Sequence, residues 1–212
     1  MTSRVLALML ACSAAALAAP RLFYSKYFKG SVPEYVATTV EQDGHVTFQT
    51  AMDDPDPIQF QLDAARTQAM FDLAAKLDHF QHPVESGLKV ANMGAKTFRF
   101  EDGSENHQVE FNYSEDPNAQ ALLDQFDQIT ETEEHFIQLD TSVHFDKLGV
   151  NDVLLQLEDT WDHKRLVAPE QFLPLLDRVA KNESFLHLAR ERAAALAEAI
   201  RKPPTPSPEK TP

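Results

Sequence analysis

The residues best placed to do chemistry include three aspartates in one short acidic loop. Asp53, Asp54 and Asp56 lie in the stretch DDPDP, whose two prolines stiffen the backbone. Carboxylate oxygens are the ligands that calcium prefers, and calcium sites need six or more of them. The loop is therefore a candidate calcium site, which makes a calcium-dependent extracellular module one possible function. The alternative is an acidic turn that only solvent contacts.

Two histidines form the second candidate site. His79 and His82 are three residues apart at the end of a predicted helix, a spacing that lets two side chains share a metal ion if the helix continues through both. Glu85 is a candidate third ligand. The alternative is that donors near a helix C-terminus are favoured because they meet unpaired carbonyls. Structural zinc takes four ligands, and the sequence does not fix the others.

Common catalytic and cofactor motifs are missing. The chain has six glycines, none spaced as a phosphate or dinucleotide loop, and it contains neither GxSxG nor HExxH. The turn 102–107 resembles the start of a calcium loop, but its sixth position is His107 instead of glycine and its twelfth is Tyr113 instead of glutamate. We therefore predict no cofactor and no catalytic residue.

Charge limits the partners. The 212 residues include 19 basic and 33 acidic side chains, a net charge of −14. Such a chain repels phosphate backbones and shows no basic stripe, which disfavours nucleic-acid binding. Anionic membrane surfaces are disfavoured for the same reason.

The N-terminus predicts export. Residues 1–18 start with a positive charge, continue as an apolar run and end in Ala16-Leu17-Ala18, the small-x-small pattern that signal peptidase cleaves. Two alternatives attach the protein to a membrane, through an uncleaved signal or through a lipid on Cys12. Because Cys12 is the only cysteine, the mature chain is free of disulfides. The predicted location is periplasmic or secreted.

The rest of the chain predicts an α+β fold. Residues 19–33 are basic and aromatic, and they are interpreted as a linker. Alternating residues predict strands between 34 and 62, with a hairpin turn at Asp43-Gly44, and again from 96 to 114; a helix starts after Asp63. Four helices follow Asp116-Pro117.

The expected architecture is an antiparallel sheet of about five strands, with one helix inserted, packed against a largely helical C-terminal half. We expect a single domain over 34–201, sheet-rich in 34–115 and helical in 116–201, then a disordered proline-rich tail over 202–212. A division near residues 114–117 is the alternative. The polar face of the 96–114 hairpin, with Arg99, Glu101, Glu110 and Asn112, is expected to face solvent.

These observations favour an exported, non-enzymatic binding or structural protein of a bacterial envelope, with an envelope or extracellular protein as its partner. The competing function is an exported hydrolase whose carboxylates or histidines come from separate elements.

Overall fold

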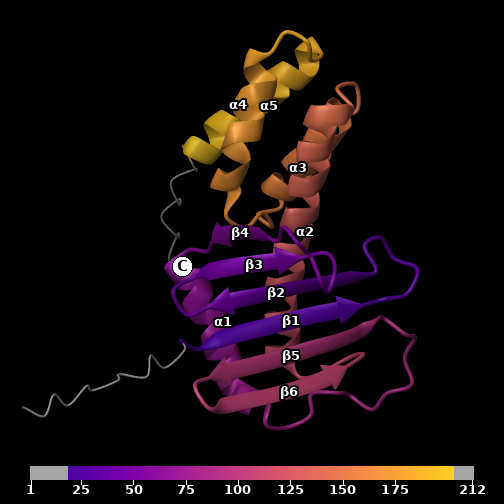
Figure 1. Cartoon of the computed structure of the whole chain (residues 1–212), viewed down its shortest axis with the longest axis vertical. Helices are drawn as coiled ribbons and strands as arrows, with labels where there is room; N and C mark the ends of the chain where they lie inside the picture. The colour runs from indigo at the N-terminus through magenta and orange to yellow at the C-terminus, as the bar shows by residue number, and fades with distance from the viewer. Residues whose placement is uncertain (1–18, 203–212) are drawn as a thin grey trace, which may run out of the picture.

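The computed structural model describes residues 19–202, and the N-terminal half of this range forms a sheet (Figure 1). Six strands build it: β1 (Arg21–Tyr27), β2 (Tyr35–Glu41), β3 (His45–Gln49), β4 (Ile58–Gln61), β5 (Ala95–Asp102) and β6 (Glu105–Phe111). They are antiparallel in the order β4-β3-β2-β1-β5-β6. The predicted signal (1–18) and nearly all of the predicted tail lie outside the described residues.

Strand β1 corrects the interpretation of residues 19–33 as a linker. It pairs with β2 on one side and β5 on the other, so it lies in the middle of the sheet. Leu22 and Tyr24 are fully buried, while Phe23 and Ser25 on the opposite face are partly exposed. Aromatic residues in a two-residue alternation are typical of such a strand.

One face of the sheet is covered by two helices, α1 (Ala64–Lys76) and α2 (Pro117–Phe145), which lie behind the strands in Figure 1. Both helices begin after the predicted N-cap residues, Asp63 and Asp116. The Asp63 side chain accepts a hydrogen bond from the Arg66 amide, and the Asp116 side chain accepts one from the Asn118 amide. The apolar side chains between helices and sheet form the first core, which includes Tyr24, Phe48, Met70, Phe98, Leu122, Phe126 and Ile129.

The other face of the sheet is polar and partly exposed, as predicted for the 96–114 hairpin. The Arg99 guanidinium lies 4.2 Å from the centre of the Phe23 ring, and its Nε is 2.8 Å from a Glu101 carboxylate oxygen. Arg21 also pairs with Glu101. These contacts pair opposite charges on that face.

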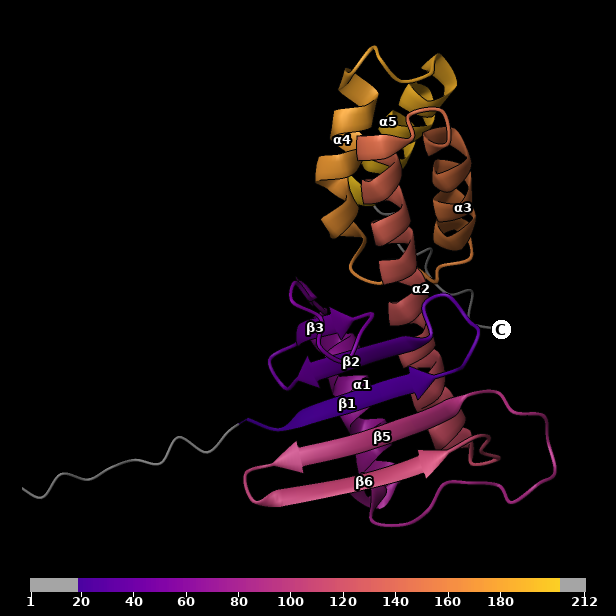
Figure 2. The ribbon, with the colours of Figure 1, turned by 45° about the vertical axis from the view of Figure 1, so that its right-hand side comes forward.

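A helical bundle stands beyond the edge of the sheet (Figure 2). Helix α2 is 29 residues long and extends past the strands, where α3 (Val150–Asp162), α4 (Leu173–Lys181) and α5 (His187–Arg201) pack against it. The four helices enclose a second core, which includes Leu139, Leu154, Leu157, Phe172, Leu176, Ala193 and Ile200. The α+β class is therefore confirmed, with α2 alone of the C-terminal helices covering the sheet.

Short elements connect these parts. The 3₁₀ turn η1 (Asp78–Phe80) follows α1, and η2 (Pro169–Phe172) precedes α4. Near η2 the backbone amide of Val167 donates to Thr132 Oγ1 at 3.0 Å, tying the α3–α4 connection to α2. None of the helices within residues 19–202 is both long and apolar enough to cross a membrane.

Candidate ligand-binding cleft

The acidic loop uses one of its carboxylates to hold its own backbone. Asp54 Oδ2 accepts from the Thr50 amide and Oδ1 from the Asp56 amide, both at 3.1 Å. These bonds form a turn, which accounts for the aspartate at its centre. A calcium site involving Asp53, Asp54 and Asp56 stays a prediction.

The histidine pair is separated by the local backbone. Helix α1 ends at Lys76, and His79 has a positive φ of 48°, so the two histidines do not share a helix face. The His79 ring stacks on Phe100, whereas His82 lies 3.2 Å from Asp78. Glu85, the candidate third ligand, accepts instead from the amide of Asn112 at 2.6 Å.

Within residues 19–202, no group of three or more histidine, cysteine, aspartate or glutamate side chains is arranged to hold a metal ion. The metal assignments of His79 and His82 therefore also stay predictions. A different set of polar residues does come together between the sheet and α2.

Two lysines stand side by side on the helix-covered face of the sheet. Lys26 of β1 is the direct cross-strand partner of Lys96 of β5. Both continue a row of buried side chains, because Lys26 follows Tyr24 by two residues and Lys96 precedes Phe98 by two. Lys96 is only 5% exposed. Buried lysines are rare, so this pair is unusual in a sheet core.

Lys96 is anchored by backbone carbonyls. Its Nζ donates to Asn112 O at 2.7 Å and to Met93 O at 3.4 Å. Burial lowers the pKa of Lys96, and the nearby charge of Lys26 lowers it further, while the carboxylates of Asp127 and Glu85 oppose the shift. The ammonium thus has a fixed position at the floor of the cleft.

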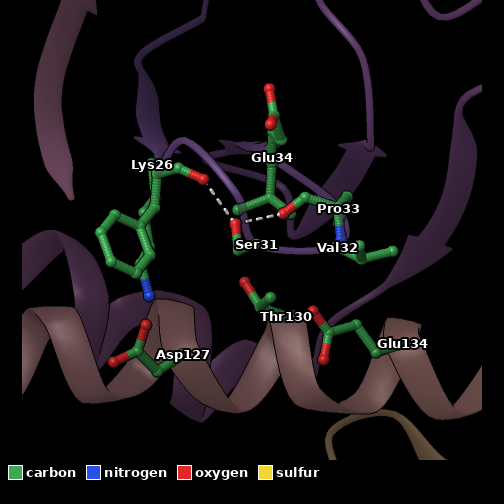
Figure 3. Close-up of a pocket in the computed structure, with 10 residues that line it drawn as sticks. Lys26, Ser31, Val32, Pro33, Glu34, Asp127, Thr130 and Glu134 are labelled. Carbon is green, nitrogen blue, oxygen red and sulfur yellow. Dashed lines mark hydrogen bonds between the residues drawn. The ribbon is translucent and has the colours of Figure 1, made fainter. Parts of the chain in front are cut away.

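Asp127 of α2 faces the lysines across the cleft. Figure 3 shows the Lys26 side chain pointing toward the Asp127 carboxylate. Burial raises the pKa of Asp127, and the positive charges of Lys26 and Lys96 partly offset that rise. Of the described residues, none forms an ion pair with the side chain of Lys26 or Asp127. Their charges therefore remain open to a ligand.

Tyr24 places a further polar group beneath this pair. Its ring stacks on Phe126, with centroids 4.9 Å apart, and the residue is fully buried. Its hydroxyl makes no hydrogen bond of regular geometry within the described part of the chain, although it lies close enough to Asp127 for a weak one. Burial raises the pKa of Tyr24, and the adjacent charge of Asp127 adds to the effect, so the hydroxyl stays protonated.

Lys26 and Asp127 line two small cavities. The first, of about 110 Å³, is bounded by Thr130 and Glu134 of α2 and by the loop 31–34, as Figure 3 shows. Burial raises the pKa of Glu134, and Lys26 opposes this shift. The second cavity, of about 180 Å³, is lined by both lysines and by Asp127. Its remaining wall is formed by Met93, Asn112, Tyr113, Ser114, Ala119, Gln120 and Leu123.

A hydroxyl–imidazole pair between α2 and α3 is the strongest enzyme-like feature elsewhere. His135 Nε2 lies 2.8 Å from Thr160 Oγ1, and burial lowers the pKa of His135, which favours a neutral base. Acyl transfer also needs donors for an oxyanion. Thr160 lies inside α3, where backbone amides donate within the helix, and the nearby Arg165 guanidinium already binds Glu131 and Asp124. Gln156, whose side chain carries an amide donor, lines the same hollow as His135 and Thr160. The hydrolase alternative stays a prediction.

Four residues at this cleft were not predicted as site residues from the sequence: Tyr24, Lys26, Lys96 and Asp127. The sequence pattern could have indicated the lysines, because in the two-residue alternation of its strand each lysine falls on the same face as the buried residues. For Asp127 the signal was weak, since it is one of 33 acidic residues and only the sheet defines which of them is covered.

Comparison with protein-family models and with curated proteins finds no match to this chain. The proposed function therefore rests on the geometry of the cleft and on the sequence pattern.

Proposed function

We propose that this protein is an exported, non-enzymatic binding protein of a bacterial envelope, which holds a small polar ligand in the cleft between the sheet and α2. The observation that carries the proposal is that charged side chains that the structure describes in this cleft form no ion pair with each other. Lys26 points at Asp127 without an ion pair between them among the described residues, and both side chains line the two cavities. A buried polar group without a partner costs about 1–3 kcal/mol. A ligand that bonds to these groups recovers that cost.

The size of the cavities restricts the ligand. Pockets for drug-sized molecules measure about 300–1,000 Å³. The two cavities in the cleft are about 110 and 180 Å³, so each accommodates only a small molecule. The fixed position of Lys96, held by two carbonyls, favours binding without a large rearrangement.

Export is supported by the pattern of residues 1–18 and by the start of the fold. Strand β1 begins at Arg21, so cleavage after Ala18 leaves every described strand intact. Mass spectrometry of the protein recovered from the envelope fraction tests this step, with Ala19 as the expected first residue. A chain that starts at Met1 and stays with the membrane supports the anchor instead.

A second candidate function is binding of an envelope or extracellular protein by the far end of the bundle. Phe145 and Leu148, at the end of α2, are 86% and 74% exposed, and Leu186 and Leu188 are also exposed. Lys147 Nζ bonds to Ser184 Oγ, which brings the two loops together. Exposed apolar clusters often mark protein contacts. A stoichiometric partner that the double variant Phe145→Ser, Leu148→Ser loses supports this function, and a partner retained by that variant contradicts it.

Thermal unfolding in the presence of small metabolites tests the cleft. The panel contains anions, amines, zwitterions and neutral polyols of similar size. We expect one class to raise the melting temperature of the wild type and of the control Lys29→Met, whose side chain is exposed near Lys26 in sequence. The same class is expected to leave the melting temperature of Lys26→Met unchanged. The proposal fails if no class binds, or if binding persists in Lys26→Met.

A further inference from the structure

We propose that the ligand of the larger cavity is a small monocarboxylate with a short apolar chain, bound with its carboxylate against Lys26 and Lys96. This inference rests on the proposed function of the cleft. Three observations support it: the net charge of the lining, the apolar side chains in the lining, and the limited volume. Each is independent of the others.

The charge balance indicates a single negative charge. Lys26, Lys96 and Asp127 are the residues with a formal charge at neutral pH that line the larger cavity, and these charges leave one positive charge unmatched. One carboxylate neutralises it. A phosphate dianion leaves excess negative charge beside Asp127, and a cation adds to the repulsion between the lysines. Buried charge is stable only when it is paired, so a monoanion is the best match.

The wall of the cavity indicates an apolar chain. Met93, Ala119 and Leu123 supply hydrocarbon surface beside the two lysines. Met93 is about half exposed and therefore lies at the mouth. A ligand with its carboxylate at the lysines directs its chain along this wall. The volume of about 180 Å³ limits that chain to a few carbon atoms.

The smaller cavity does not offer the same match. Asp127 and Glu134 line it together with Lys26, and the Ser31 hydroxyl is held 2.7 Å from the carbonyls of Phe28 and Pro33. A donor such as water or an ammonium group suits this lining better than a carboxylate. An amine is accordingly the competing ligand class for the cleft as a whole.

Binding of an anion here is coupled to a proton. A ligand carboxylate beside Asp127 disfavours the charged form of that residue, whose pKa burial already raises. The groups that face Asp127 are Tyr24 and Lys26 from β1, Lys96 from β5, Asp124 and Glu134 from α2, and Arg165 from the α3–α4 connection. The ligand adds one negative charge to this set. We therefore expect proton uptake on binding and an affinity that falls as the pH rises.

Isothermal titration with matched probes tests the ligand class. The probes are acetate, butanoate, hexanoate and decanoate, with butylamine and inorganic phosphate for comparison. We expect the dissociation constant to fall about fourfold per added methylene up to hexanoate, and decanoate to bind more weakly because it exceeds the cavity. Repeating the butanoate titration in buffers of different ionisation enthalpy measures the proton uptake.

Two lysine variants locate the site. Lys26→Met and Lys96→Met are each expected to weaken butanoate binding at least tenfold, while Lys29→Met binds as the wild type does. Circular dichroism checks that each variant is folded, and Lys26→Met alone suffices if Lys96→Met does not fold.

The outcomes separate this inference from the proposed function. If butylamine or phosphate binds in place of the carboxylates, and Lys26→Met abolishes that binding, the monocarboxylate assignment is wrong and the binding cleft remains. If carboxylates bind equally well to Lys26→Met, the ligand lies elsewhere and both proposals fall. If none of these probes binds, the monocarboxylate assignment is overturned, and the cleft itself is overturned only if the zwitterions and polyols of the thermal panel also fail to bind.

Discussion

Lys26 and Lys96 are direct partners across the centre of the sheet, so two ammonium groups lie next to each other on its buried face. Like charges in this position reduce the stability of a sheet. Asp127 supplies only one opposing charge, and it meets neither lysine in an ion pair within the described residues. The lysine pair therefore lowers the stability of the fold. Residues that lower stability are often kept because they have a function.

The charge coupling in this cluster predicts the effect of Lys26→Met. Lys26 lowers the pKa of both Lys96 and Asp127. Removing its charge is therefore expected to raise both pKa values. NMR titration of the Lys96 side-chain carbons and of the Asp127 carboxyl carbon measures the two shifts. The exposed Lys29→Met control is expected to leave both unchanged, and an unchanged Lys96 pKa in Lys26→Met contradicts the coupling.

Tyr24→Phe is expected to stabilise the protein. The variant removes a buried hydroxyl that makes no hydrogen bond of regular geometry among the described residues, while keeping the ring that stacks on Phe126. An unsatisfied buried group costs about 1–3 kcal/mol, so we expect the free energy of unfolding to rise by about 1 kcal/mol. Urea unfolding at pH 7 measures it. A loss of stability instead shows that the hydroxyl is hydrogen-bonded in solution.

Much of the fold could be predicted from local patterns. The N-caps Asp63 and Asp116 are where their residue types indicated, and Phe98 and Phe100 share a buried face as their spacing predicted. Strand β1 was missed because its two basic residues, Arg21 and Lys26, obscured an otherwise regular alternation. The separation of α3, α4 and α5 into a second core depends on the length of α2, which carries them past the sheet.

The candidate site could not be predicted in the same way. Its lysines are 70 positions apart in the chain, and they meet only because β1 pairs with β5. No local period fixes such a long-range pairing. The acidic partner depends on the rotation of α2 above the sheet, which sets Asp127 over the lysines. The metal candidates were chosen by local spacing, which the positive φ of His79 alters.

Gly44→Ala is expected to disturb the turn between β2 and β3. Gly44 has a φ of +89°, and an added Cβ would lie 2.6 Å from Gln61 Nε2 and 2.9 Å from Leu62 O. The positive φ costs about 1–2 kcal/mol for alanine, and overpacking adds about 1–3 kcal/mol. Urea unfolding is therefore expected to show that the free energy of unfolding of Gly44→Ala is about 3 kcal/mol lower than that of the wild type.

Gly30→Ala is the matched control for this substitution. Gly30 has the same φ of +89°, but its Cβ would meet nothing within 4 Å. Its expected loss is about 1 kcal/mol, from the backbone alone. Equal losses in the two variants would show that the contacts around Gly44 relax without cost.

Glu133 predicts a pH dependence of stability. This fully buried residue of α2 accepts one hydrogen bond, from Gln171 Nε2 at 3.0 Å, and its second carboxyl oxygen has no partner within the described residues. Burial raises its pKa to about 7, although the bond from Gln171 opposes the shift. The folded protein thus holds a proton that the unfolded chain releases near pH 4.5. The free energy of unfolding is therefore expected to fall as the pH rises from about 4.5 to 7.

The variant Glu133→Gln removes this dependence because an amide does not titrate. A rise in the pKa of Glu133 from 4.5 to about 7 corresponds to about 3 kcal/mol. At pH 8 the free energy of unfolding of the variant is therefore expected to exceed that of the wild type by up to this amount. At pH 4 the carboxyl is protonated in both states, and the two proteins are expected to match. Glu170→Gln, an exposed glutamate beside Gln171, controls for the loss of one surface charge. If Glu133→Gln and Glu170→Gln show the same difference from the wild type at both pH values, the carboxyl of Glu133 is not protonated in the folded protein.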